Sequence, residues 1–182
     1  EWLQMFADQQ LTYTEALAIR LVYAAREVEE VVDLDELATV QALPQQVRDG
    51  GITMGRRLLS IGAASYPGPW TLHCAAEVEA GRMQGHQAVV WGVLARELGL
   101  DQGTAVAAHV QATSTSLTQN AVRGIPLGQS AGQRIIRAAQ DWTRRAVEVS
   151  RGLEREDLGA IAPGLEIAQM HHERQRARLF MS

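Results

Sequence analysis

The sequence contains no lysine, and all seventeen of its basic residues are arginine. A phosphate-binding loop of the type G-x-x-x-x-G-K-[ST] requires lysine, so hydrolysis of ATP or GTP by that route is excluded. The net charge of −4 provides no basic patch for nucleic acid. The longest strongly apolar run, residues 88–95, is too short to cross a bilayer. We therefore expect neither nucleic-acid binding nor a membrane span.

Cysteine is represented only by Cys74, so an intrachain disulfide is impossible. A single thiol fits a reducing cytoplasm, and no signal peptide opens the chain. The chain starts at Glu1 without an initiator methionine, inside a stretch with helical spacing. We expect a cytoplasmic protein, and we expect that an N-terminal segment precedes residue 1.

Strand patterns are also absent, because no stretch alternates polar and apolar residues with β-branched enrichment. Apolar residues recur at helical spacing, as from Ile135 to Leu153, where the steps alternate between four and three. Residues 104–122 carry no charged side chain and are rich in small residues, which predicts a central buried helix. No linker divides the chain. The sequence therefore predicts one all-α domain over residues 1–182, a bundle-like fold of about eight or more helices without a sheet.

Helix starts are predicted from capping signals. Thr12 and Glu15 form a capping box, in which each side chain bonds a backbone N–H near the other residue. Residues 33–36 carry a similar signal, and Pro163 is suited to the first position of a helix. These signals predict helices that begin near residues 12, 33 and 163.

Residues 128–132 read Gly-Gln-Ser-Ala-Gly and match G-x-S-x-G, the nucleophile elbow of α/β-hydrolases. Candidate acid and base residues follow in hydrolase order: Asp141 or Asp157, then His171 or His172. The elbow needs a strand that runs into it, and none is predicted. Ser130 and Gln133 instead fit a capping box before a helical stripe. We favour Ser130 as a helix cap, and a serine hydrolase is the remote alternative.

The spacing of histidines and carboxylates in this sequence gives little indication of a metal site. Two ligands on one helix chelate a metal when they lie three or four residues apart. Neither His171 nor His172 has a histidine or carboxylate at that spacing, and Glu173 adds none. A metal site at these three residues would need ligands from another helix or another subunit. We favour a surface or interface role for them and expect no tightly bound cofactor.

The remaining histidines have structural interpretations. His73 stands beside Cys74 without a C-x-x-C motif, which favours a small buried thiol. His86 precedes a predicted helix and is expected to cap it or to lie in the loop. His109 lies in the uncharged helix, where we expect a hydrogen-bonded core residue, with a polar internal channel as the alternative.

Three stretches carry a family resemblance when they are taken in order. They are GHQAVVWGVLARELGL (85–100), NAVRGIPLGQSAGQRII (120–136) and APGLEIAQMHHERQRARLFMS (162–182). Together they resemble the UreF family of urease accessory proteins, and TMGRRLLSIG (53–62) fits in sequence. The opening segment of that family is absent here, and Met181 stands where the family usually has arginine.

The resemblance implies an all-α, non-enzymatic chaperone that forms a homodimer. UreF-like proteins bind UreD, also called UreH, and the GTPase UreG, and the assembly delivers nickel to apo-urease. The resemblance implies that this chain recruits UreG, modulates its GTPase activity, and leaves nickel handling to the complex. A direct nickel carrier that uses the tail histidine pair is the alternative.

Two surfaces are predicted to bind partners. The first is the C-terminal tail, residues 178–182, with the polar face before it: His171, His172, Glu173, Arg174, Arg178, Leu179, Phe180, Met181 and Ser182. Phe180 in a free tail would need a partner pocket, and the alternative is that it folds back onto the body. The second surface is the proline turn with Arg123, Gln129 and Gln133, whose alternative role is capping and loop hydrogen bonding.

Overall fold

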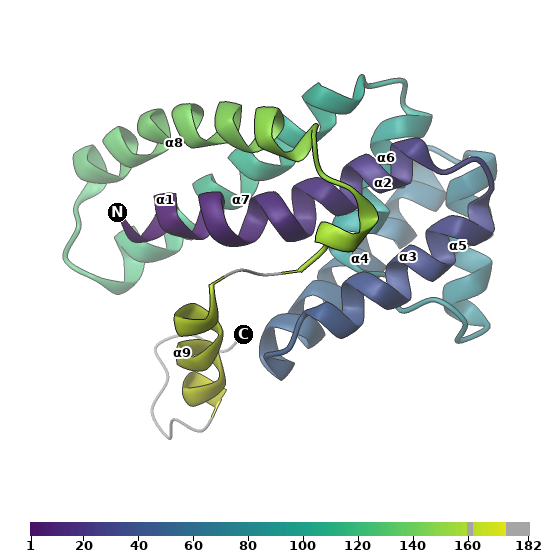
Figure 1. The fold of residues 1–182 in the computed structure, drawn as a ribbon, viewed down its shortest axis with the longest axis horizontal. Helices are drawn as coiled ribbons and strands as arrows, with labels where there is room; N and C mark the ends of the chain where they lie inside the picture. Colours follow the sequence, from purple (N-terminus) through teal and green to yellow (C-terminus); the bar gives the residue numbers. More distant parts are fainter. Residues whose placement is uncertain (160–161, 174–182) are drawn as a thin grey trace.

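The computed structural model describes residues 1–159 and 162–173, and every regular element within these ranges is helical (Figure 1). The predicted all-α class without a sheet is confirmed. No described helix is long and apolar enough to cross a membrane. In chain order the elements are α1 (Trp2–Phe6), the π-helix η1 (Ala7–Ala16), α2 (Leu17–Ala24), α3 (Val28–Gln41), α4 (Gln45–Ser65), α5 (Pro69–Glu79), α6 (Gln87–Glu97), α7 (Gln102–Gly124), α8 (Gln129–Ser150), the 3₁₀-helix η2 (Arg155–Asp157) and α9 (Pro163–Glu173).

The first three elements, α1, η1 and α2, form one continuous helical rod (Figure 1). The capping box predicted at Thr12 is wrong, because the chain is already helical before this residue and has no helix start to cap. The Thr12 hydroxyl donates to the carbonyl of Ala7 at 2.8 Å. The start predicted at residues 33–36 is also wrong, since α3 begins at Val28. The start predicted at Pro163 is confirmed.

Helix α6 forms the centre of the core, where it contacts α2, α4, α5 and α7. Most of its residues are buried, and glycines let neighbouring helices approach it closely. A Cβ at Gly55 of α4 would lie 2.7 Å from the backbone nitrogen of Gln87, the first residue of α6, closer than real side chains come. The approach of α4 to the start of α6 therefore depends on a residue without a side chain.

Helices α7 and α8 run antiparallel and are joined by a short turn at the left end of the view in Figure 1. The middle of the predicted α8 seam is buried, at Ala139, Trp142 and Ala146. The prediction of a central buried helix over residues 104–122 is confirmed for one face of α7 only, because Ala112 and Gln119 on the other face are exposed. An uncharged sequence of small polar residues suits a solvent-facing helix surface as well as a buried one, so charge alone did not decide burial.

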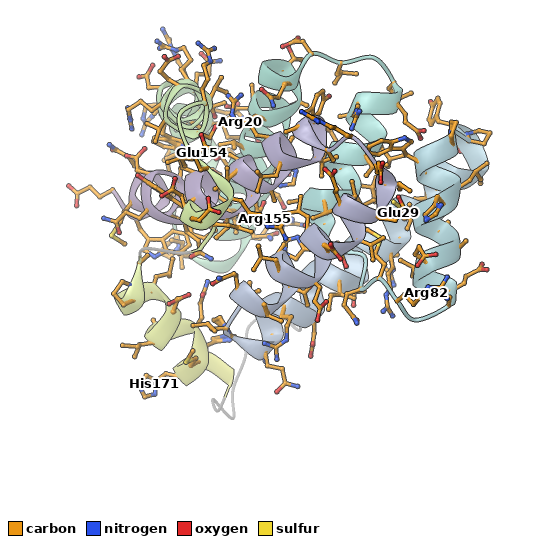
Figure 2. The ribbon with its side chains drawn as sticks, turned by 45° about the vertical axis from the view of Figure 1, so that its right-hand side comes forward. Arg20, Glu29, Arg82, Glu154, Arg155 and His171 are labelled. Atoms are coloured by element: carbon orange, nitrogen blue, oxygen red, sulfur yellow. The ribbon has the colours of Figure 1, made fainter. Side chains whose placement is uncertain are left out.

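A buried arginine joins the inner ends of these helices to α2 (Figure 2). Arg20 is 7% exposed and donates to Gln102 Oε1 at 2.6 Å, to Ser150 Oγ at 2.7 Å and to the carbonyl of Val147. All of these acceptors are neutral oxygens. Three of the five guanidinium N–H donors are thus matched by acceptors on α7 and α8, and these bonds orient the two helices against the core.

Candidate functional site

The turn between α7 and α8, which we call the α7–α8 corner, is shaped by proline and glycine. Pro126 and Gly128 stand in the turn, and Gly128 has a φ of 72°, a backbone conformation that glycine adopts without strain. Gly128 is the N-cap of α8, and Ser130 lies exposed in the first turn. The prediction that Ser130 caps the helix is wrong, because the glycine turns the chain into α8 before Ser130 is reached. The start of α8 has no side-chain cap.

A cleft of about 270 Å³ opens at the corner between the last turns of α7 and the first turns of α8. Its walls are Thr118, Gln119, Val122, Arg123, Gln129, Gly132, Gln133 and Ile136. Three residues predicted for partner binding, Arg123, Gln129 and Gln133, therefore lie around one cavity. The sequence predicted a shared surface for these residues but not the cavity, because the cavity forms only when the two helices fold back on each other.

The floor of the cleft is a close helix contact. A Cβ at Gly132 would lie 2.6 Å from Cγ2 of Val122, so the absence of a side chain sets how near α8 comes to α7. Gly132 is buried, whereas Gln129 and Gln133 are exposed one helical turn apart on the same helix. The two amides therefore stand side by side above a fixed apolar contact.

Polar groups at the cleft have few partners within the protein. Arg123 donates to Asn120 Oδ1 at 2.8 Å and to the carbonyl of Gln119 at 3.4 Å, and both acceptors are neutral. The side chains of Gln129 and Gln133 make no hydrogen bond to any described residue. Amides that neither cap a helix nor bind the loop can donate and accept toward a bound molecule.

Ser130 has no catalytic surroundings in the described part of the chain. It follows a glycine turn rather than a strand, and no described histidine or aspartate forms a hydrogen bond with it. Asp141 pairs with Arg144, and Asp157 caps η2 through the backbone N–H of Glu154. The residues needed for a hydrolase triad are thus not assembled around this serine.

The described part of the predicted C-terminal surface lies on α9, which is placed below the helical body in Figure 1 and contacts α4. His172 Nδ1 lies 3.1 Å from Oε1 of Gln46 at the start of α4. His171 is exposed and lies on the outer side of α9 (Figure 2). The two histidines therefore point in different directions, and no group of three His, Cys, Asp or Glu residues in the described ranges could hold a metal ion. The Glu173 side chain and Arg174, Arg178, Leu179, Phe180, Met181 and Ser182 lie outside the described residues.

A buried polar contact joins two residues that no local sequence pattern connects. Glu15 of η1 forms a hydrogen bond with Nε2 of His109 in α7, and the His109 side chain is 4% exposed. Burial raises the pKa of Glu15, but the hydrogen bond and charge of His109 outweigh burial and hold the pKa below its ordinary value. The prediction of a hydrogen-bonded core histidine at His109 is confirmed. Its partner was not predictable from spacing, because the two residues are far apart in the sequence.

A second buried carboxylate organises the start of α6. Asp35 is fully buried and accepts hydrogen bonds from the backbone N–H groups of Gln84 at 2.7 Å, Gly85 at 3.0 Å and His86 at 2.6 Å. His86 caps α6, as predicted, with Nδ1 accepting from Ala88 N–H at 3.3 Å. Burial lowers the pKa of His86, which favours the neutral ring that this cap requires. The family-like Gly-His sequence at 85–86 is therefore a structural element.

The buried-thiol prediction for Cys74 is confirmed. Burial, with the nearby charges of Asp35, Glu97 and Glu77, raises the pKa of this thiol to about 12. A thiol with this pKa is neutral and unreactive at physiological pH. Nε2 of the neighbouring His73 lies 3.7 Å from Oε1 of Glu77, one helical turn further along α5.

Comparison with known proteins gives the family directly. The UreF family profile matches residues 1–140. The urease accessory protein UreF of Kocuria rhizophila is 67% identical over 186 residues, which cover 100% of this chain and 80% of that protein. The proteins of the same name from Corynebacterium efficiens and Arthrobacter sp. are each 51% identical over 181 residues, covering 100% of this chain and 79% of theirs. The chain belongs to the UreF family of urease accessory proteins.

Proposed function

We propose that this chain is a non-enzymatic adaptor in the maturation of urease. It bridges a UreD/UreH-type subunit and the GTPase UreG, modulates the GTPase activity of UreG, and acts as a cytoplasmic homodimer. Nickel is the cargo of the assembly on its way to apo-urease. Membership of the UreF family supports the role in urease maturation.

The α7–α8 corner is the observation that carries the adaptor role. It offers an open cleft of about 270 Å³ whose amide and guanidinium groups have few internal partners. The nucleophile-like Ser130 lies outside any triad, so the corner has the features of a binding surface. Clefts with a few convergent polar groups are the usual form of recognition sites.

The test is co-purification of the full chain with UreD-type and UreG-type proteins from the same source. We expect a complex with both proteins, and we expect loss of at least one of them when residues 178–182 are deleted. Helical content measured by circular dichroism should be retained in the deletion variant, because the deletion leaves every described helix intact. Retention of both partners by the deletion variant would remove the tail from the binding surface. Failure of the full chain to bind either partner would overturn the adaptor role.

Nickel binding by the isolated chain separates the adaptor from a direct carrier. Isothermal titration of Ni²⁺ into the full chain should give no heat above that of buffer, since the described residues assemble no three-ligand group. Binding that disappears in the His171→Ala/His172→Ala double variant would favour the carrier.

A further inference from the structure

The charges around the α7–α8 corner have a single sign. Residues 102–140 contain three arginines, Arg123, Arg134 and Arg137, and no acidic residue. The chain as a whole has the opposite balance, with a net charge of −4, and residues 1–101 hold fourteen acidic residues against seven basic ones. The corner is therefore a local basic surface on an acidic protein.

The arginines in the two halves of α8 differ in whether they form ion pairs. In the second half, Arg144 pairs with Asp141, and Arg145 pairs with Asp8 of η1. At the end of the helix, Arg151 pairs with Glu148. In the first half, Arg134 and Arg137 are exposed and form no ion pair with any described residue. The unpaired charges are thus confined to the end of α8 that borders the cleft.

The unpaired groups also share a direction. Gln129, Gln133 and Arg137 follow one another at intervals of four residues, which places them in one row along α8. Gln129 and Gln133 line the cleft, and Arg123 faces them from the last turn of α7. The N-terminus of the chain lies at this end of the molecule in Figure 1. Even with the single charge of Glu1 counted here, the three arginines leave the corner with a net positive charge.

We propose that the α7–α8 corner is the docking site for an acidic segment of a partner protein, with carboxylates seated between Arg123 and the Gln129–Gln133–Arg137 row. Arginine binds carboxylates through two parallel N–H···O bonds, and the glutamine amides supply further donors beside it. This inference rests on the proposed adaptor function. It adds the chemistry of one contact between the adaptor and a partner, in which carboxylates of the partner meet arginine and amide groups of the corner. Exposed charges of this kind steer association and set its salt dependence.

The first measurement uses the candidate partners with the full chain. The variant R123E/R134E/R137E reverses the sign of the charge at the corner. The control variant, R26E/R57E/R155E, makes the same change in net charge elsewhere in the chain. The control arginines are exposed and form no ion pair with described residues. We expect the corner variant to bind one partner about tenfold or more weakly at 50 mM NaCl and to lose most of the salt dependence, because the steering charges are gone. The control variant should bind as the wild type does.

A second measurement needs no natural partner. A fluorescein-labelled decaglutamate peptide is titrated with the full chain and followed by fluorescence anisotropy, with a decaglutamine peptide as the neutral probe. We expect the wild type and the control variant to bind decaglutamate at low salt, and the corner variant to bind at least about tenfold more weakly. This result would support carboxylate binding at the corner even if neither candidate partner bound. In that case only the proposed adaptor function would be overturned.

Three outcomes would overturn the proposal. One is equal loss of binding in the corner and control variants, which would make net charge the cause. Another is unchanged partner and peptide binding by the corner variant. If analytical ultracentrifugation instead showed a changed oligomeric state for that variant with partner affinity intact, the corner would belong to a contact between copies of this chain, and the acidic partner would be ruled out.

Discussion

The two ends of the α7–α8 pair differ in how their polar groups are used. At the inner end, Arg20 bonds Gln102 and Ser150, and His109 pairs with Glu15. At the outer end, the corner exposes arginines and glutamines that have few or no protein partners. A polar group that is buried and fully bonded holds the fold together, whereas one left open around a cleft is available to another molecule. Substitutions at buried, bonded groups of this kind, which include Asp35 and His86 outside the α7–α8 pair, should therefore change stability, and substitutions at the corner should change binding.

Removal of the buried carboxylate at Asp35 should have the largest effect on stability. Asp35→Ala leaves the backbone N–H groups of residues 84–86 without their acceptor inside the core. Three charge-assisted hydrogen bonds are lost, so we expect the free energy of unfolding to fall by roughly 3–5 kcal/mol. Urea unfolding followed by circular dichroism at 222 nm measures this change.

The matched control is Asp33→Ala on the same helix, because Asp33 is exposed and forms no ion pair with described residues. Its free energy of unfolding should change by less than about 0.5 kcal/mol. Equal effects of the two substitutions would show that Asp35 does not organise the loop before α6.

The Glu15–His109 pair should contribute less to the free energy of unfolding than Asp35 does, because 26% of the Glu15 side chain is exposed. Glu15→Gln removes the charge and keeps the shape, and we expect a loss of about 1–3 kcal/mol in the free energy of unfolding. A double-mutant cycle with His109→Gln isolates the coupling between the two side chains. A coupling energy near zero would mean that the two groups stabilise the protein independently.

Lowering the pH should reduce the stability that buried polar groups contribute before it affects the α7–α8 corner. The folded pKa of His86 is lowered, so its contribution is complete above the unfolded pKa of about 6.5 and is lost as the pH falls. The neutral ring accepts the Ala88 N–H, and protonation of Nδ1 removes that acceptor. We expect stability to decline below pH 6.5 with a slope of at most about 1.4 kcal/mol per pH unit for this group.

The test compares thermal unfolding of the wild type and His86→Asn between pH 5 and 7.5, because asparagine can cap a helix without titrating in this range. The asparagine variant should show a flatter dependence on pH. Glu15 adds a second acid-sensitive step at lower pH, since its folded pKa also lies below the ordinary value. Identical pH profiles for the two proteins would assign the acid sensitivity to other groups.

Periodicity predicted the fold class well, because the helices bury one face each and that face repeats in the sequence. Helix starts were harder to predict. Thr12 and Ser130 both match capping motifs, yet Thr12 lies inside a continuous rod and Ser130 follows a glycine that had already capped α8. A capping motif identifies a residue that is able to cap, whereas the actual helix start depends on the backbone before it.

The candidate site was predictable only in part. Arg123, Gln129 and Gln133 lie close together in the sequence, so a shared surface was a reasonable expectation, but the cleft between them depends on the approach of Gly132 to Val122. The Glu15–His109 pair joins residues from opposite halves of the chain, and no local pattern marks such a contact. Long-range polar pairs of this kind are set by packing, which a single sequence does not display.

The smallest effect on stability is expected at the corner itself. R123E/R134E/R137E breaks no ion pair among the described residues, and exposed substitutions usually change stability by less than about 0.5 kcal/mol each. The substitution at residue 123 would place a carboxylate in the last turn of α7, where the helix dipole disfavours negative charge by about 0.3–1 kcal/mol, whereas residues 134 and 137 lie beyond the first turn of α8. We therefore expect a melting temperature equal to that of the wild type or slightly below it, measured by differential scanning calorimetry. A marked loss of stability would mean that the corner arginines hold the fold, and the contrast between the two ends of the α7–α8 pair would then be wrong.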